Sequence, residues 1–414
     1  MTSFTRWLTL LVLLLAPLTG LAAAPSAASR PLTVYFFDVG QGDAALVVSP
    51  TGKTVLIDGG PPEARERLAR RLRELVKEPL DLVILTHPHL DHLGGLTEAV
   101  RAVGAKRFMD PGFDHPSDAY RDLLDFVGGA VGQVMTPEPN PKSPETLLTI
   151  GLGEGVSLSV LWPRVPQEPF LDDTRSDPNS NSIVAKLTYG KTAILFTGDA
   201  EPDTEAALLQ KRIDFTSTVL KVAHHGGRHS STAAFLAAVK PKAAVISCGV
   251  GNDYGHPTPE ALERLKATGA RVFRTDQDGE VVAVSDGTSV SLRAGNGGAA
   301  LVAPGGVKPG PVALGPILPS PSRARRSRDR EPEPAPRGGT GAVTVKRPDP
   351  APPTTPRGSA AVGAEVSRFI GLKGSKVFHR EDCGALKRSK SERTVYTSRD
   401  AAARERRPAE DCHP

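Results

Sequence analysis

The chain has 414 residues, a formal net charge of +5, 38 prolines and 41 glycines. Its 39% hydrophobic and 23% charged residues fit a soluble globular protein rather than a membrane-embedded or wholly disordered one, and three cysteines exclude a disulfide-rich scaffold. From Pro304 onward there are 22 Lys or Arg and 12 Asp or Glu, so this part carries +10 and the preceding 303 residues carry −5. The overall charge therefore averages an acidic part and a basic part.

Residues 1–24 have the three parts of a secretory signal peptide. Arg6 supplies an early positive charge, an apolar run extends from Trp7 to Leu21, and three alanines at 22–24 provide a small-residue cleavage site. The run is short for a membrane span, although an uncleaved anchor is the alternative. We expect cleavage after Ala24, export to the periplasm or the medium, and no transmembrane domain beyond the signal peptide.

Residues 32–295 are expected to form one α/β domain, because short apolar strands alternate with helical patterns. The expected strands are Thr33–Phe37, Val55–Ile57, Leu82–Leu85, Val156–Leu161, Ile183–Thr188, Ala193–Phe196, Val219–Val222, Ala244–Ser247 and Val272–Arg274. Helices are expected between Glu63 and Glu78 and after Gly95, Glu201, Thr232 and Pro257. Polar residues and histidines follow several strand ends, where α/β proteins place their chemistry.

The segment 304–356 differs in composition from the rest of the chain. It holds 14 prolines and 7 glycines in 53 residues. A segment of this composition cannot bury enough apolar surface to offset the entropy cost of ordering it. We therefore expect an extended linker. Its arginine run at 323–330 predicts contact with nucleic acid or another anionic surface, or serves only solubility. Residues 367–414 regain apolar side chains and are expected to form a small module.

The main chemical signal follows the strand Leu82–Leu85. The segment 86–95 reads THPHLDHLGG, so three imidazoles and a carboxylate lie within six residues at a strand-to-helix turn. Imidazole and carboxylate are suitable ligands for Zn²⁺ or Mn²⁺. Alternation lets His87 and His89 point to one side, whereas Asp91 and His92 can address a second ion.

These residues resemble the His-x-His-x-Asp-His motif of the metallo-β-lactamase superfamily, and the resemblance continues along the chain. The further motifs are DVGQGDA at 38–44, LIDGG at 56–60, TGD at 197–199, LKVAHHG at 220–226, YGHP at 254–257 and RTDQDG at 274–279. Together they are similar to the extracytoplasmic hydrolase domain of ComEC-type competence proteins. The resemblance implies an αββα metallo-β-lactamase sandwich with a two-metal site at one edge.

The resemblance also implies a ligand set for two divalent metal ions, Zn²⁺ or Mn²⁺. The implied ligands are His87, His89, Asp91, His92, Asp199 and His224. His87 and His89 would hold the first ion, Asp91 and His92 the second, and Asp199 would bridge both. His225 and His256 are alternatives to His224 for the last position of the second site.

Further residues would assist this set. The resemblance assigns proton transfer to Asp91, His225 or His256. Asp58 would support the ligand histidines and fix their tautomers. Asp43 and Gln41, in the first turn, would contact the substrate or brace the site.

One segment departs from the common family pattern. Many members carry a ligand histidine before the strand that leads to the bridging aspartate, whereas residues 177–182 here read DPNSNS. Asn181 is therefore expected in the supporting shell or against the substrate. The first metal would have weaker protein ligation, and it would favour Mn²⁺ or take oxygens from the substrate.

The resemblance implies a hydroxide that bridges two metals, because two cations lower the pKa of a shared water. Its implied target is a phosphodiester in nucleic acid or a nucleotide-like molecule. We thus expect a secreted ComEC-like phosphodiesterase or nuclease. The alternatives are a metallo-hydrolase of lactam, lactone or thioester substrates, and a non-catalytic envelope or nucleic-acid binding protein with a vestigial site.

The tail contains His379, Cys383 and Cys412, with Ala409 three residues before the last cysteine. These residues resemble the pattern of the small zinc-binding module of Ada-type DNA repair proteins, in which another cysteine is expected at the position of Ala409. His413 could complete a structural Zn site. In an exported protein the two tail cysteines could instead form a disulfide. The third cysteine, Cys248, is expected in the core.

Overall fold

The computed structural model describes residues 30–163, 168–211, 213–302, 369–372, 377–380, 386, 393–396 and 406–408. The expected signal peptide and the expected linker at 304–356 lie outside these residues. Within the described ranges, no helix combines the length and apolar character needed to cross a membrane.

The first large sheet has nine strands in the order β16-β15-β14-β1-β2-β3-β4-β5-β6. In chain order these are β1 (Leu32–Phe36), β2 (Ala45–Val48), β3 (Thr54–Ile57), β4 (Leu82–Ile84), β5 (Arg107–Met109), β6 (Gln133–Met135), β14 (Val281–Ser285), β15 (Val290–Ala294) and β16 (Ala299–Val302). Pairing is antiparallel from β16 to β3 and parallel from β3 to β6.

The second large sheet has seven strands in the order β13-β12-β11-β10-β9-β8-β7. In chain order these are β7 (Thr149–Gly151), β8 (Val156–Trp162), β9 (Val184–Tyr189), β10 (Thr192–Phe196), β11 (Val219–Lys221), β12 (Ala243–Ile246) and β13 (Arg271–Arg274). It also has an antiparallel half, β7 to β10, and a parallel half, β10 to β13.

The two sheets pack face to face because their side chains alternate between two apolar layers. In β1, Val34 and Phe36 enter the core between the sheets, whereas Tyr35 packs on the helical side. In β10, Ile194 belongs to the same central core and Leu195 faces the other helical layer. This period of two buries both faces of each sheet. The expected αββα sandwich is thus confirmed.

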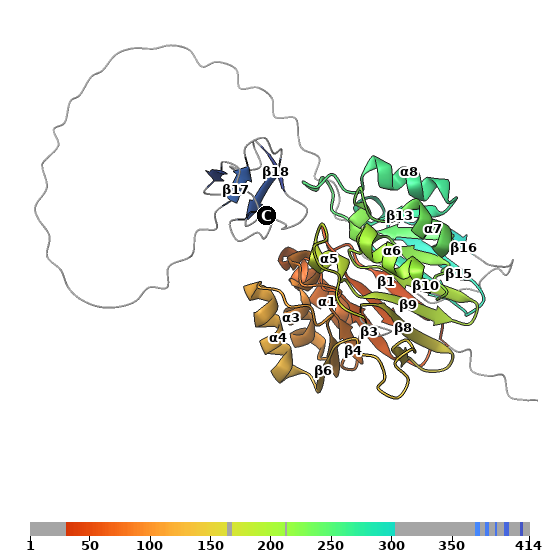
Figure 1. Cartoon of the computed structure of the whole chain (residues 1–414). Coiled ribbons are helices and arrows are strands. Elements are labelled where there is room, and N and C mark those ends of the chain that lie inside the picture. Colours follow the sequence, from red (N-terminus) through yellow and green to blue (C-terminus); the bar gives the residue numbers. More distant parts are fainter. Residues whose placement is uncertain are drawn as a thin grey trace, which may run out of the picture.

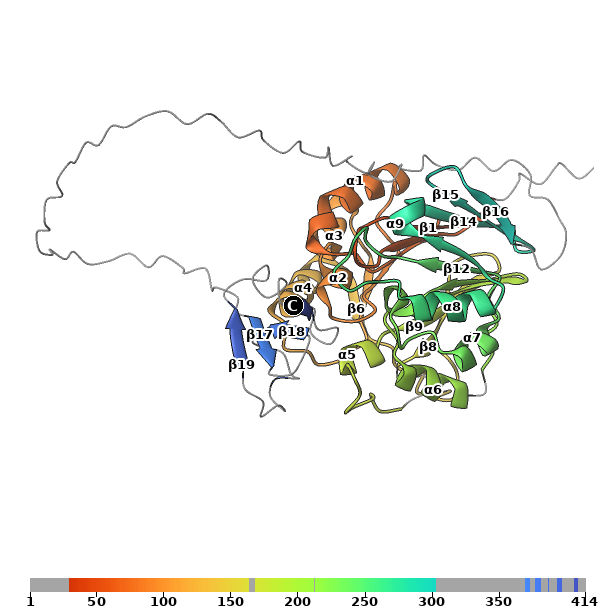
Figure 2. The same ribbon diagram turned by 90° about the horizontal axis from the view of Figure 1, so that it is seen from above.

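Helices cover the two outer faces of the sandwich (Figures 1 and 2). The first sheet is covered by α1 (Arg65–Leu75), α3 (Leu96–Val103) and α4 (Asp118–Ala130), and the second by α6 (Pro202–Gln210), α7 (Ala233–Val239) and α8 (Pro259–Ala267). The N-cap side chains of Thr232 and Thr258 accept hydrogen bonds from the first turns of α7 and α8, which fixes where these helices begin. Short helical turns η1 (Pro62–Ala64), α2 (Leu90–Leu93), α5 (Asp177–Ser180), η2 (Ala223–Gly226) and α9 (Thr275–Asp278) lie in the loops.

The parallel halves of the sheets position the functional residues. The segment 86–92 follows β4, the TGD turn follows β10, and the paired histidines of η2 follow β11. Because the carboxyl ends of parallel strands meet at one edge, residues distant in sequence converge there.

The tail contributes a small sheet in the order β19-β17-β18-β20. Its strands are β17 (Phe369–Leu372), β18 (Val377–Arg380), β19 (Arg393–Tyr396) and β20 (Arg407–Pro408). His379 is a buried residue of β18. Cys383, Cys412 and His413 lie outside the described residues, so the structural Zn site and the disulfide both stay predictions.

Candidate metal centre

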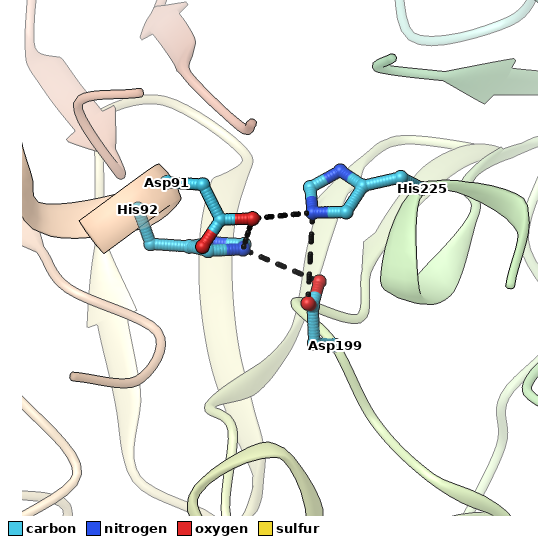
Figure 3. Close-up of side chains that lie close together, drawn as sticks. All are labelled: Asp91, His92, Asp199 and His225. Carbon is cyan, nitrogen blue, oxygen red and sulfur yellow. Dashed lines mark hydrogen bonds and ion pairs between the residues drawn. The ribbon is translucent and has the colours of Figure 1, made fainter. Parts of the chain in front are cut away.

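Four side chains from three loops meet at the edge of the sandwich (Figure 3). Asp91, His92, Asp199 and His225 each offer one ligand atom, and these atoms all lie within 4.8 Å of one another. Nε2 of His225 lies 3.1 Å from Oδ2 of Asp91 and 3.6 Å from Oδ2 of Asp199. Nε2 of His92 lies 3.3 Å from the other Asp199 oxygen. The carboxylate of Asp199 therefore faces imidazoles from both sheets.

The turn of α2 that carries Asp91 and His92 is held by close backbone contacts. The Asp43 N–H donates to the Asp91 carbonyl at 3.0 Å, and the Gly59 N–H donates to the His92 carbonyl at 2.6 Å. Gly42 is required for this approach, since a Cβ there would lie 2.3 Å from the Asp91 carbonyl oxygen. The glycine motifs at 38–44 and 56–60 thus pack against the turn that carries Asp91 and His92 and hydrogen-bond to its backbone.

Two further histidines approach Asp199 from outside this group of four. Nε2 of His87 and Nε2 of His224 are each 3.8 Å from Asp199 Oδ2, the oxygen that His225 also approaches. Nε2 of His87 is also 3.1 Å from Nδ1 of His89. Asp199 is consequently close to four imidazoles through its two carboxylate oxygens.

The compact group contains His225 rather than His224, since His225 joins Asp91 and His92. Both histidines adopt left-handed backbone angles in η2, with φ of 50° and 52°, and their rings stand at 74° to one another. Glu201 Oε1 lies 3.0 Å from His224 Nδ1 and orients this ring with its Nε2 3.8 Å from Asp199 Oδ2. The choice of His224, His225 or His256 as the last metal ligand stays a prediction.

Each imidazole near Asp199 is oriented by a second contact. Asp58 Oδ2 lies 2.8 Å from His92 Nδ1, and Asp58 also accepts hydrogen bonds from the N–H and hydroxyl of Thr86 at 2.7 and 2.8 Å. The Ser247 carbonyl lies 3.0 Å from His225 Nδ1. Such contacts leave Nε2 for a metal and fix the tautomer. Glu201 and Ser247 were not among the expected residues. The only sequence signal for Glu201 is its position two residues after Asp199.

The first turn supports the site from behind. Asp43 is buried and forms a 2.7 Å ion pair with Lys221, and its other oxygen lies 3.4 Å from His225 Nδ1. Gln41 accepts a hydrogen bond from the Gly249 N–H at 3.1 Å. Of the two roles expected for these residues, the contacts favour bracing.

The hydrogen bonds of Asn181 go to the backbone and not to a candidate ligand. Its amide accepts a hydrogen bond from the Leu171 N–H and donates to the carbonyls of Leu171 and Asp177, so it ties a loop together. Its expected role in the supporting shell or against the substrate stays a prediction. Asn179, two residues earlier, is fully buried, and its amide forms no hydrogen bond with the described residues.

His256 lies beside the metal group rather than in it. Its buried ring stacks on that of His225 at 6.2 Å between centroids and stands edge-on to His224 at 5.6 Å. The described metal-ligand groups do not include it.

The electrostatics of the site call for a cation. Burial alone raises the pKa of Asp199, but His225, His92 and His224 hold it well below its usual range. Conversely, burial lowers the pKa of His225, yet Asp199 and Asp43 raise it to about 10. In the absence of metal, buried carboxylates are therefore balanced by protons on imidazoles. Nitrogen and oxygen donors at this spacing fit divalent Zn²⁺ or Mn²⁺, which would replace those protons.

Comparison with known families agrees with this geometry. Residues 37–167 match the model of the metallo-beta-lactamase superfamily. This segment, which includes the turn that carries Asp91 and His92, is therefore similar to that superfamily.

Two curated relatives are similar to a larger part of the chain. ComE operon protein 3 of Bacillus subtilis (strain 168) is 30% identical over 274 residues, which are 60% of this chain and 32% of that protein. Competence protein ComA of Neisseria gonorrhoeae is 30% identical over 247 residues, 59% of this chain and 31% of that protein. The chain thus spans about a third of the length of these relatives. Among solved structures, Zn(2+)-bound PqqB from Methylobacterium extorquens matches with 12% identity and a TM-score of 0.35, over 56% of this chain and 85% of that one.

Proposed function

We propose that the protein is an exported phosphodiesterase that acts on nucleic acid or a nucleotide-like substrate and depends on two divalent ions. The observation that carries this proposal is Asp199, whose two carboxylate oxygens lie 3.3–3.8 Å from imidazole nitrogens of His92, His225, His87 and His224, the first two of which form a compact group with Asp91. A shared carboxylate between nitrogen donors is the arrangement that two-metal phosphodiester hydrolysis uses.

The substrate class is supported by the relatives. One of them is named competence protein ComA, and a further relative of 30% identity from Haemophilus influenzae is named recombination protein 2. Both processes involve DNA, which makes DNA the first substrate to test.

The side chains divide the work as follows. Two ions held here would supply Lewis acidity toward a phosphoryl oxygen and lower the pKa of a nearby water. Asp199 directs one carboxylate oxygen toward His92 and the other toward His87, His224 and His225. Asp91, with 12% of its side chain exposed, can take up a proton at Oδ2, and His225 Nε2 lies 3.1 Å from that atom. Asp58 and Ser247 keep the imidazoles in the tautomer that presents Nε2.

Activity of the full chain tests the proposal. The protein is stripped with EDTA, reloaded with Zn²⁺ or Mn²⁺, and assayed on bis(p-nitrophenyl) phosphate, single- and double-stranded DNA, RNA and a chromogenic lactam. We expect cleavage of the phosphodiesters with at least one metal, and no turnover after stripping. Hydrolysis of the lactam alone would overturn the proposal, as would metal binding without any phosphodiester cleavage.

Two variants make the test specific. Asp199→Asn keeps the side-chain shape but weakens the bridging ligand. Asp214→Asn is the matched control, because Asp214 is 74% exposed and its carboxylate pairs with Lys186 outside the site. Only the first variant should lose both metal and activity. Export, and contact of the arginine run at 323–330 with anionic surfaces, remain part of the proposal.

A further inference from the structure

Three rings form a series that leads away from the metal centre. His225 lies in the cluster with Asp91 and Asp199, and His256 stacks on it at 6.2 Å with an interplanar angle of 28°. Tyr254 stacks in turn on His256 at 5.8 Å and 27°. His225 and His256 are buried and Tyr254 is half-buried, so the series runs from the ligand toward the surface.

The loop that carries the outer ring is held in a fixed shape. The Asn252 side chain donates to the carbonyls of Gly249 and His256 at 2.9 and 2.6 Å and accepts from the His256 N–H at 2.9 Å. Gln41, from the turn that braces the metal-binding residues, accepts from the Gly249 N–H. The loop between β12 and α8 is therefore tied to the opposite sheet beside the metal centre. Its ring positions are defined relative to the metal ligands rather than left to a mobile segment.

The chemistry of this loop suits a planar, uncharged group. Tyr254 presents an aromatic ring, and the neighbouring Val250 is 63% exposed. The charged residue in the segment 249–256 is Asp253, which is exposed and would repel a phosphate. An aromatic ring with an apolar neighbour favours stacking of a base, whereas a phosphate would require cationic partners.

We propose that Tyr254 determines specificity by stacking a nucleobase attached to the phosphodiester that occupies the metal centre. This rests on the proposed phosphodiesterase function and extends it. Tyr254 touches the base and not the reacting atoms, so its effect falls mainly on substrate binding. His256 links the two positions, because its ring packs between Tyr254 and His225.

Two phosphodiesters that share one leaving group test the proposal. They are the p-nitrophenyl ester of thymidine monophosphate, which carries a base, and methyl p-nitrophenyl phosphate, which does not. The metal-loaded full chain should prefer the thymidine ester. In Tyr254→Ala we expect kcat/KM for this ester to fall by about tenfold, mostly through KM, since stacking on an aromatic side chain has roughly this value per base. Hydrolysis of the methyl ester should stay unchanged.

One further variant and a binding measurement complete the design. Tyr254→Phe keeps the ring and should retain the preference. Calorimetric binding of thymidine monophosphate should weaken in Tyr254→Ala and not in Tyr254→Phe, which is a readout independent of turnover.

The outcomes separate the two proposals. If neither ester is hydrolysed under any metal, the phosphodiesterase function fails. If both are hydrolysed and Tyr254→Ala leaves their ratio and the nucleotide affinity unchanged, the function stands and the stacking role is overturned. An equal loss on both esters would assign Tyr254 to the metal centre or the fold, and would also overturn it.

Discussion

Buried charges occur in two regions of the domain, and they are balanced in different ways. Between α1 and the residue before β14, Arg71 and Glu280 form a two-pronged ion pair with N–O distances of 2.8 and 3.0 Å, and 1% and 3% of their side chains are exposed. At the metal centre, fully buried Asp199 has imidazoles 3.3–3.8 Å away and no Lys or Arg partner among the described ion pairs.

The difference separates structural from functional burial. A buried charge is costly unless a counter-charge with good geometry accompanies it. The Arg71–Glu280 pair supplies its own counter-charge, so its contribution does not depend on any ligand. The Asp199 carboxylate has only titratable partners, which is the condition of a site that is balanced by a bound cation. The two regions should therefore respond differently to mutation, to chelators and to pH.

The largest effect is expected at Asp199. Asp199→Asn removes the carboxylate charge that the four nearby imidazoles share, so the site should bind metal less well. Hydrolysis should fall roughly a thousandfold, because a lost Lewis acid is worth several kcal/mol. Metal content measured by atomic absorption should fall with it. A variant that kept its full metal content would contradict the bridging role.

The opposite pattern is expected at Arg71. Arg71→Met leaves Glu280 buried without a partner, which should lower the free energy of unfolding by about 3–5 kcal/mol. The double variant Arg71→Met/Glu280→Leu should recover most of this loss. Urea denaturation measures both, and metal stoichiometry should be unchanged in each. If the double variant were as unstable as the single one, packing rather than charge would explain the effect.

The strands of the fold were predictable where a short stretch of sequence carries the apolar pattern by itself. Each of the nine expected strands corresponds to an observed strand, because continuous apolar runs such as that of β10 lie in the middle of the sandwich. The expected strands did not include seven strands of the two large sheets, namely β2, β5, β6, β7, β14, β15 and β16. Among them, the three-residue strands β5 and β6 begin at Arg107 and Gln133 and give too short a pattern. α4 was also missed. Its sequence ends in Gly128 and Gly129, which weakens a helical pattern that packing nevertheless stabilises.

The site was predictable in composition but not in connectivity. The motif spacing named every member of the four-residue group, yet it favoured His224 over His225, and the group contains His225. Two consecutive histidines cannot be told apart by spacing, because the left-handed turn of η2 and the contact of Glu201 with His224 are properties of the fold. The backbone contacts of Asn181 could not be predicted for a similar reason, since an amide in a loop can serve the backbone as readily as a substrate.

The two histidines of η2 give the next prediction. His225→Ala removes a member of the compact group with Asp91, and affinity for the tighter metal should fall by roughly a hundredfold. His224→Ala removes an imidazole outside that group, so it should keep the tighter ion and lose the weaker one. Calorimetric titration with Mn²⁺ resolves the two events. Equal losses in both variants would mean that the two groups do not form distinguishable metal positions.

The smallest expected effect is the pH dependence of the chelated protein, and its sign distinguishes the two regions. The pKa of His225 is raised to about 10 in the folded state, and that of His92 is raised well above its usual value. A folded-state pKa above the unfolded one means that the native protein binds more protons. The stability that these groups contribute is therefore complete below their unfolded pKa of about 6.5 and is lost as the pH rises toward 10.

Metal should reverse that trend, because bound imidazoles are already deprotonated and binding strengthens as protons leave. The gap in melting temperature between metal-loaded and chelated protein should consequently widen from pH 6.5 to pH 10. The Asp199→Asn variant should show a smaller gap, since the carboxylate that raises the histidine pKa values is gone. The Arg71→Met variant, with its defect outside the site, should keep the widening. Parallel curves for loaded and chelated protein would show that the buried charges of the site are not balanced by protons that a cation displaces.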